Sequence, residues 1–294
     1  MANTPGDAQR AFPPSLPQML IEGAVRAALL EDLGRAGDIT TNATLPEDAT
    51  AAAVLSSREA GTICGLGFAR AAFALIDPSL TFTAFVKDGA RVNRGDNVAR
   101  IEGNARAILS AERVALNYLM HLSGIASYTA KFADLIAHTN AKVCDTRKTI
   151  PGMRAFAKYA VKCGGGANHR FGLDDAILIK DNHVAVAGGV AKAILAARAY
   201  AGHLVKIEVE VDGIHQLEEA LSVQADVILL DNMGPELLEK AVKINAGRAK
   251  LEASGGIAFD TIKSIAETGV DYISTSKITM AAPTLDIGLD IELT

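Results

Sequence analysis

The sequence predicts an α/β protein whose C-terminal half is an array of parallel β/α units. From Lys142 onward, six strand-like segments alternate with helix-like segments, the pattern of parallel strands joined by right-handed crossovers. Each strand-like segment ends in polar residues, and neither GxGxxG nor GxxxxGK[ST] follows a strand. Six such units fit a closed or nearly closed barrel better than an open dinucleotide-binding sheet.

The residues before this array predict an arm, a helix and a small α+β domain. Residues 1–14 are small and polar and include two adjacent prolines, so we expect a mobile arm. A capping-box pattern at residues 15–18 begins a helical periodicity that Gly34 can close. Between residues 51 and 101, short alternating segments predict strands around one helix at 67–76.

Two helices are expected between that domain and the array. Apolar residues recur at helical spacing over 107–122 and again over 125–138. We therefore place an N-terminal domain at residues 15–124 and the barrel at 125–281, and expect the tail, residues 282–294, to pack with the N-terminal domain.

The array itself reads as six strands and the helices between them. The strands are expected at 142–144, 176–179, 205–211, 226–230, 250–253 and 271–274. The most regular helices are expected at 187–201, 215–221, 235–245 and 259–268.

Composition excludes several classes of function. The 294-residue chain has a net charge of −5, which argues against nucleic acid and anionic membranes as partners. No apolar run is long enough for a membrane span, and the N-terminus lacks a signal-peptide pattern. Cys64, Cys144 and Cys163 are odd in number and far apart, which predicts a reducing compartment, here the cytoplasm, without a disulfide framework or a structural zinc site.

One stretch of the chain is cationic. Residues 145–183 contain seven Lys or Arg and four Asp, a net charge of +3 in an acidic protein. Arg147 and Arg170 offer planar forks for carboxylate or phosphate, and Lys148 and Lys180 offer point charges. Such groups at strand ends would repel one another unless an anion joins them, so we expect a small polyanionic ligand.

Carboxylates and a glycine loop follow later strands. Lys206, Glu208, Glu210 and Asp212 share one face of a strand by its period of two, which suits either a solvent-facing edge or the mouth of a barrel. We favour the mouth, with Glu210 and Asp231 as functional carboxylates that hold Mg²⁺ or stabilise a ribosyl cation. The loop Ser254, Gly255 and Gly256 after a late strand is suited to phosphate.

Ordered motifs in the chain resemble those of the quinolinate phosphoribosyltransferases. They are ERVALN (112–117), LSGIA (122–126), DTRKT (145–149), PGMR (151–154), NHR (168–170), LIKDNH (178–183), EVEVD (208–212), LDN (230–232) and SGGI (254–257). The resemblance implies an N-terminal α/β sandwich, a C-terminal α/β barrel and a homodimer, or a higher oligomer, with shared sites. It also implies transfer of phosphoribosyl from phosphoribosyl pyrophosphate to quinolinate with Mg²⁺, giving nicotinate mononucleotide, pyrophosphate and CO₂ for NAD biosynthesis.

The resemblance also implies roles for individual residues. Arg147, His169 and Arg170 would hold the quinolinate carboxylates, joined by Arg113 from the partner subunit. Four residues would act near the reacting groups: Lys148, Lys180, Glu210 and Asp231, the last two near ribose and metal, directly or through water. The loop of Ser254, Gly255 and Gly256 would take the 5-phosphate.

One segment departs from the family pattern, and three other functions stay open. Where the family resembles ISVGALTHS, this chain has ISTSKITMA at 273–281, so that Ser276 and Met280 replace a glycine and a histidine. A paralogue associated with molybdate transport is the closest alternative. The others are a Schiff-base aldolase that uses Lys180 and a non-catalytic anion-binding protein.

Overall fold

The computed structural model describes residues 15–292 and divides the chain into two compact units. The described part of the first unit comprises residues 15–130, 156–165 and 282–292, and the second comprises residues 131–155 and 166–281. The arm expected at residues 1–14 lies outside the described residues. None of the described helices is long and apolar enough to cross a membrane.

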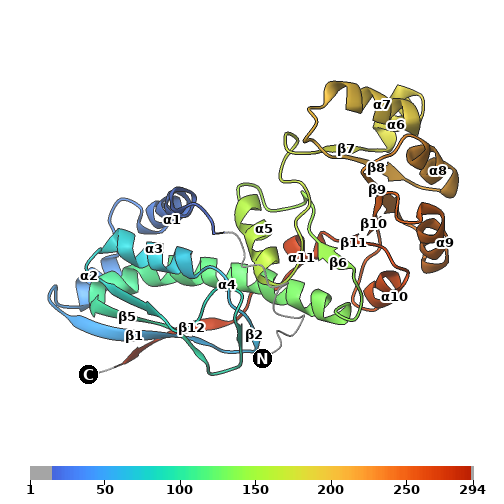
Figure 1. The fold of residues 1–294 in the computed structure, drawn as a ribbon. Coiled ribbons are helices and arrows are strands. Elements are labelled where there is room, and N and C mark those ends of the chain that lie inside the picture. The colour runs from blue at the N-terminus through green and yellow to red at the C-terminus, as the bar shows by residue number, and fades with distance from the viewer. Residues whose placement is uncertain (1–14, 293–294) are drawn as a thin grey trace, which may run out of the picture. The chain divides into compact units, whose positions relative to one another are not determined.

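The first unit is built on a four-stranded antiparallel sheet in the order β12-β1-β5-β3. Its strands are β1 (Thr50–Ser57), β3 (Thr81–Ala84), β5 (Asn97–Asn104) and β12 (Ile287–Glu292), with a separate pair, β2 (Gly61–Thr62) and β4 (Arg91–Val92). Its helices include α1 (Gln18–Leu33), α2 (Ile39–Thr44) and α3 (Leu66–Ile76). Figure 1 shows α3 and the long helix α4 (Ala105–Leu135) on one side of the sheet, the two-layer arrangement of an α/β sandwich.

Helix α4 replaces the two helices expected from the sequence. The structure has one continuous helix where 107–122 and 125–138 were predicted to be separate, so that prediction was wrong. Gly124, which lies between the two predicted ranges, is inside the helix, and the chain near Pro283 packs against it there. A Cβ at this position would lie 2.1 Å from the Pro283 carbonyl oxygen. Glycine is needed for this close approach and does not mark a helix end.

Helix α1 also begins differently from the prediction. It starts at Gln18 with Pro17 at the N-cap, and no side chain caps it. The expected capping box at residues 15–18 is therefore not formed, and proline fixes the entry of the chain instead.

The second unit is a parallel sheet of six strands in the order β6-β11-β10-β9-β8-β7. The strands are β6 (Lys142–Cys144), β7 (Ile177–Ile179), β8 (Ile207–Val211), β9 (Val227–Asp231), β10 (Lys250–Ser254) and β11 (Tyr272–Ser274). Helices connect them: α5 (Arg154–Cys163), α6 (Asp181–Ala187), α7 (Val190–Tyr200), α8 (Ile214–Ser222), α9 (Pro235–Asn245), α10 (Ile262–Glu267) and α11 (Lys277–Met280). Helix α5 belongs largely to the first unit. All six strands match the prediction within two residues at each end. Strands β6 and β7 are the two edges of the sheet, which has the strand order of a nearly closed α/β barrel.

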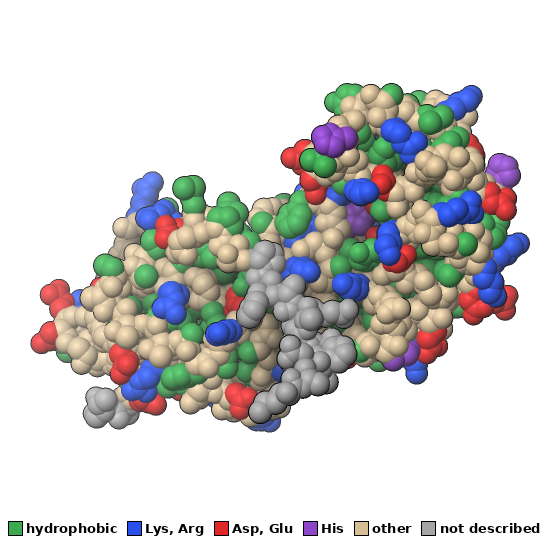
Figure 2. Space-filling model, viewed as in Figure 1, with side chains coloured by type: hydrophobic (Ala, Val, Ile, Leu, Met, Phe, Trp, Pro, Cys, Tyr) green, Lys and Arg blue, Asp and Glu red, His purple; other side chains and the backbone are tan. Residues whose placement is uncertain are grey.

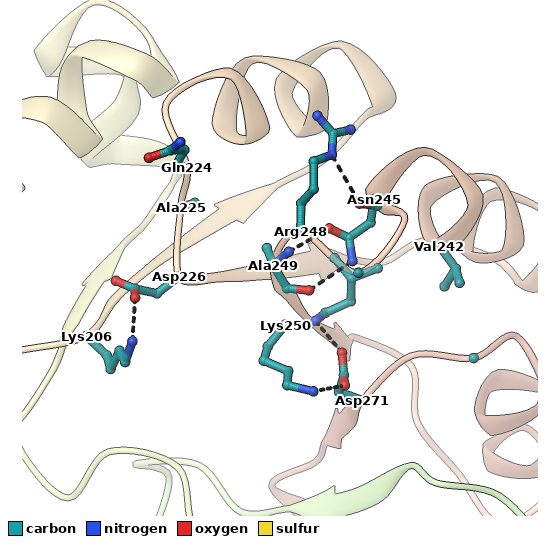
Figure 3. Close-up of a pocket in the computed structure, with 13 residues that line it drawn as sticks. Lys206, Gln224, Ala225, Asp226, Val242, Asn245, Arg248, Ala249, Lys250 and Asp271 are labelled. Atoms are coloured by element: carbon teal, nitrogen blue, oxygen red, sulfur yellow. Dashed lines mark hydrogen bonds and ion pairs between the residues drawn. The ribbon is translucent and has the colours of Figure 1, made fainter.

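Repeated ion pairs join the amino-terminal ends of neighbouring strands. Lys206 bonds to Asp226, and Lys250 bonds to Asp271, each at 2.6 Å. Each aspartate also accepts a backbone N–H from the residue that follows its lysine. These groups line a cavity of about 480 Å³ (Figure 3). Because barrel chemistry lies at the opposite, carboxyl ends of the strands, we assign this cavity to the structural base of the barrel.

Two of the three cysteines, Cys64 and Cys163, lie close together in the core of the first unit. The ligand atoms of Cys64, Asp88 and Cys163 lie within 4.8 Å of one another. The Asp88 carboxylate accepts hydrogen bonds from the Gly65 amide at 3.0 Å and from the Tyr159 hydroxyl at 2.8 Å. Burial raises the pKa of the Cys64 thiol. Cys64 is therefore a buried, protonated thiol with low reactivity, and Cys163 is buried beside it.

Candidate active site

The register of the barrel brings the predicted site residues of the second unit to one end and one side of its strands. Glu210 pairs with Leu229, and Leu229 pairs with Glu252. Paired residues of parallel strands point to the same side of a sheet, and so does Glu208, two residues before Glu210. In the next row Asp231 pairs with Ser254. Carboxylates from β8, β9 and β10 therefore lie on the same side of the sheet.

Asp145 anchors the loop that carries His169 and Arg170. Its side chain is fully buried and accepts hydrogen bonds from the His169 backbone N–H at 2.9 Å and the Asn168 amide at 2.6 Å. Its own backbone N–H donates to the Ala167 carbonyl at 3.2 Å. The loop is thereby tied to the end of β6, which brings residues more than 20 positions apart into one site. No role was assigned to Asp145 from the sequence.

Arg147 and Arg170 form the cationic part of the site. The pKa of Arg170 is lowered, first by burial and then by the positive charge of Arg147. The Nε atoms of both guanidinium groups are buried without a hydrogen-bond partner, although Arg170 Nη1 donates to the Ala176 carbonyl at 3.1 Å. Two desolvated cations with unsatisfied donors are suited to a bidentate anion.

His169 is engaged by protein groups at both ring nitrogens. Nδ1 accepts the Arg170 backbone N–H at 2.8 Å, and Nε2 lies 2.8 Å from a carboxylate oxygen of Glu208. Each ring nitrogen has a protein partner in this structure, and the expected role of the ring in holding a quinolinate carboxylate stays a prediction. His169 therefore lies between the backbone of its own loop and Glu208 of β8.

Glu252 completes a buried group that we call the His169 cluster, consisting of His169, Glu208 and Glu252. The ligand atoms of the three lie within 4.8 Å of one another, and Nε2 of His169 is 3.8 Å from Glu252 Oε1. Burial, followed by the negative charge of Glu208, raises the pKa of Glu252 to about 7. Glu252 was missed in the sequence. The available signal was its place two residues before Ser254, on the same strand face.

Lys180 and Glu210 form a close ion pair at the next strand ends. Lys180 Nζ lies 2.6 Å from Glu210, and the lysine is half exposed while the glutamate is mostly buried. The Lys180 backbone N–H donates to His183 Nδ1 at 2.9 Å, which fixes the turn into α6. An ammonium group paired in this way is suited to an anionic substrate, whereas a Schiff-base lysine must react as the free amine.

The glycine loop approaches its neighbour closely. A Cβ at Gly255 would lie 2.1 Å from Asn232 Oδ1, and its φ is +89°. The Asn232 amide in turn donates to Asp231 at 2.7 Å, and its backbone N–H donates to the Ser254 carbonyl at 2.8 Å. Asn232 therefore links Asp231 to the loop. Helix α10 begins only at Ile262, so the loop amides, and not the expected helix terminus, are the candidate phosphate donors.

The segment that departs from the family pattern supports Lys148. The Thr279 hydroxyl of α11 donates to the Lys148 carbonyl at 2.8 Å. Met280, which stands in place of a histidine, is 55 % exposed, and Ser276 provides no side-chain cap to α11. The contact from this segment to Lys148 is thus made by Thr279.

Arg113 is exposed on α4 in the first unit. Its neighbour Glu112 is half-buried, and burial raises the pKa of that carboxyl while the charge of Arg113 opposes the shift. Its expected role in a partner subunit's site stays a prediction.

Carboxylate oxygens suited to Mg²⁺ are present at the strand ends. Within residues 15–292, Glu210 and Asp231 belong to neither cluster of three or more potential metal ligands. Glu210 and Asp231 already accept from Lys180 and Asn232 respectively. This arrangement fits an ion held by one or two carboxylates together with water and substrate phosphates, as Mg²⁺ commonly is.

On the face shown in Figure 2, acidic and basic side chains are interspersed, and the described residues there form no continuous basic surface. This distribution agrees with a small anionic ligand at a local cationic site better than with a nucleic acid.

Comparison with known proteins gives consistent matches along the chain. Residues 38–123 match the N-terminal domain of quinolinate phosphoribosyl transferase, and residues 125–290 match the C-terminal domain. The chain is 42% identical over 264 residues to the probable nicotinate-nucleotide pyrophosphorylase [carboxylating] of Bacillus subtilis, covering 90% of this chain and 91% of the relative. It is also 42% identical to the corresponding Mycobacterium leprae protein, covering 91% of this chain and 95% of the relative.

Solved structures give the same result. The nicotinate-nucleotide pyrophosphorylase of Francisella tularensis superposes with a TM-score of 0.91 at 40% identity, covering 95% of this chain and 98% of the other. NadC from Streptococcus pyogenes superposes with a TM-score of 0.91 at 44% identity, covering 95% and 99%. With both domains matched in order, the chain belongs to the quinolinate phosphoribosyl transferase family.

Proposed function

We propose that the protein transfers phosphoribosyl from phosphoribosyl pyrophosphate to quinolinate and releases CO₂, giving nicotinate mononucleotide and pyrophosphate for NAD biosynthesis. One observation carries the choice of substrate: Arg147 and Arg170 are adjacent, partly desolvated, and each has a buried Nε without a partner. A planar dicarboxylate supplies acceptors to such donors in pairs. The names of the relatives that share both domains support the same reaction.

The bond to ribose forms at the carboxyl ends of β8 and β9. The pyridine nitrogen attacks C1 of the ribose while the C1–pyrophosphate bond breaks, and positive charge develops on the sugar. Glu210 and Asp231 are carboxylates at this end of the barrel and would stabilise that charge electrostatically. Lys148 and Lys180 would hold the anionic groups of the two substrates.

Loss of CO₂ follows from the product of that step. The bond between ring carbon C2 and its carboxylate breaks, and its electron pair remains at C2, where the adjacent pyridinium nitrogen stabilises it. CO₂ leaves, and C2 takes up a proton. The guanidinium groups of Arg147 and Arg170 would orient the ring and keep the remaining carboxylate bound.

The loop at Ser254, Gly255 and Gly256 would bind the 5-phosphate through backbone N–H groups. The glycines allow a close approach, and Asn232 fixes the loop against Asp231. Mg²⁺ bound at Glu210 and Asp231, directly or through water, would neutralise charge on the pyrophosphate group.

The assembly we propose is a homodimer, or a higher oligomer, in which Arg113 acts in the partner's site. The exposure of this arginine on α4 leaves it available to a second subunit. Mixing Arg113→Ala and Lys148→Ala chains should restore part of the activity in heterodimers. Exchange of subunits without restored activity would contradict the shared site. The cytoplasmic location expected from cysteine usage stays a prediction.

The reaction is tested by following products. The protein is incubated with quinolinate, phosphoribosyl pyrophosphate and Mg²⁺, and nicotinate mononucleotide and CO₂ are measured by mass spectrometry. Arg147→Ala should abolish the product, while Lys263→Ala, which removes an exposed charge on α10, should leave it unchanged. Folded wild-type protein that makes no product would refute the proposal and favour the paralogue associated with molybdate transport.

A further inference from the structure

The His169 cluster has a definite pattern of donors and acceptors. The Arg170 backbone N–H donates to Nδ1 of His169, so this nitrogen carries a lone pair and no proton. Nε2 lies 2.8 Å from a Glu208 oxygen, to which it donates. The geometry therefore makes Nδ1 of His169 the acceptor of the backbone N–H and Glu208 the acceptor of the ring N–H.

Glu252 then lies among groups that disfavour a second negative charge. It is 4 % exposed, and its Oε1 has no hydrogen-bond partner. Burial and the negative charges of Glu208 from β8 and Asp145 after β6 raise the pKa of Glu252, while His169 from the loop and the Ser274 hydroxyl from β11 oppose the shift. Asp145 accepts from the His169 backbone N–H and the Asn168 amide, and Glu208 lies 2.8 Å from His169 Nε2. An ionised Glu252 would be a third negative charge in a closed space.

We propose that Glu252 is partly protonated near neutral pH in the ligand-free protein, and that binding of a dicarboxylate at Arg147 and Arg170 draws additional proton onto Glu252. The last part rests on the proposed function. Glu252 need not touch the substrate to have this effect.

The coupling follows from charge. A bound dicarboxylate places two negative charges beside Arg147 and Arg170, and the positive charge of Arg170 otherwise interacts with Glu208. The pKa of Glu252, already raised to about 7 by burial and by Glu208, would rise further. At pH 7 the carboxyl is about half protonated, so binding should take up as much as about half a proton per ligand. Above pH 7 the affinity for the dicarboxylate should fall by up to about tenfold per pH unit, because binding takes up a proton and the proton concentration falls tenfold per unit.

The resting proton is tested without any ligand. Infrared difference spectra of the full-length protein, taken between pH 5 and pH 9, should show a protonated carboxyl band that is lost as the pH rises through about 7. Glu252→Gln should lack this band, and Glu218→Gln, an exposed change on α8, should keep it. A wild-type spectrum without such a band would overturn the proposal, whatever the protein does with quinolinate.

The coupling is tested by calorimetry with quinolinate as the probe. Titrations at pH 7 in buffers of different ionisation enthalpy should give net proton uptake for the wild type and none for Glu252→Gln. The variant imitates the protonated carboxyl, so its affinity should stay within about threefold of the wild type at pH 7 and should not fall at pH 8. Equal proton uptake by both proteins, or none by the wild type, would overturn the proposal. A band at Glu252 with no quinolinate binding would instead refute the proposed function and the coupling, and leave the proton on Glu252 supported.

Discussion

The buried Glu252 carboxyl predicts an unusual dependence of stability on pH. Its pKa in the folded protein is about 7, against an ordinary value of 4.5. The folded state therefore binds the proton more tightly than the unfolded state does. The stabilisation from this group is fully present below about pH 4.5 and is lost as the pH rises through about 7. This is opposite in sign to the usual ion-paired carboxylate.

The magnitude follows from the shift. The pKa rises from 4.5 to about 7, and at about 1.4 kcal/mol per unit this corresponds to about 3 kcal/mol. Between pH 5 and pH 8 the free energy of unfolding of the wild type should fall by about 2–3 kcal/mol relative to Glu252→Gln, which has no titrating group here. The residue is only 4 % exposed, so screening by solvent removes little of this effect.

The assay is urea unfolding of both proteins at pH 5, 6, 7 and 8, followed by circular dichroism. Glu218→Gln, an exposed substitution on α8, serves as the control and should keep the wild-type slope. A difference between wild type and Glu252→Gln that changes by less than about 0.5 kcal/mol over this range would refute the reasoning. It would mean that Glu252 is ionised in the folded protein or that its surroundings rearrange.

Three further substitutions test other parts of the structure. Gly255→Ala should raise the KM for phosphoribosyl pyrophosphate at least tenfold, because the new Cβ would meet Asn232 Oδ1 at 2.1 Å; steady-state kinetics measure this, and an unchanged KM would contradict the loop assignment. His169→Asn, which keeps an oxygen acceptor for the following backbone amide, should lose less quinolinate affinity in calorimetry than His169→Ala does; equal losses would indicate direct contact with substrate. Gly124→Ala should destabilise the protein by about 2–4 kcal/mol in urea unfolding, since its Cβ would lie 2.1 Å from the Pro283 oxygen; a loss below about 1 kcal/mol would show that the backbone relaxes there.

The barrel strands were predictable because each is a short local signal that ends in polar residues. The positions of the six strands agree with the prediction within two residues, since each is a short segment rich in β-branched or other apolar residues between turn signals. The long helix α4 was not predictable in the same way. The reason that Gly124 lies inside it is a contact with Pro283, a residue about 160 positions later, and local propensity contains no information about that contact.

The candidate site also contains residues that were predictable from the sequence and contacts that were not. Arg147, Lys148, Lys180, Glu210 and Asp231 were predicted as site residues because charged residues at strand ends are conspicuous in sequence and matched the family motifs, and their roles stay predictions. The partners of His169 could not be identified, because they come from β8 and from the next residue's backbone, and only the folded register brings them together. Family motifs indicate which residues belong to a site, but they do not distinguish a residue that holds substrate from one that holds another residue.

The acidic residues of the His169 cluster explain how a site for a dianion can keep its arginines in place before the ligand arrives. Arg147 and Arg170 repel each other, and burial makes that repulsion stronger than in water. Asp145 fixes the loop that carries Arg170 through three hydrogen bonds to residues 167–169, and Glu208 compensates its charge through the barrel interior. A fully ionised third carboxylate would bind the arginines too strongly and compete with the substrate. A carboxyl that keeps its proton near neutral pH provides the shape of the floor without that charge, and the arginines keep donors for an incoming dicarboxylate.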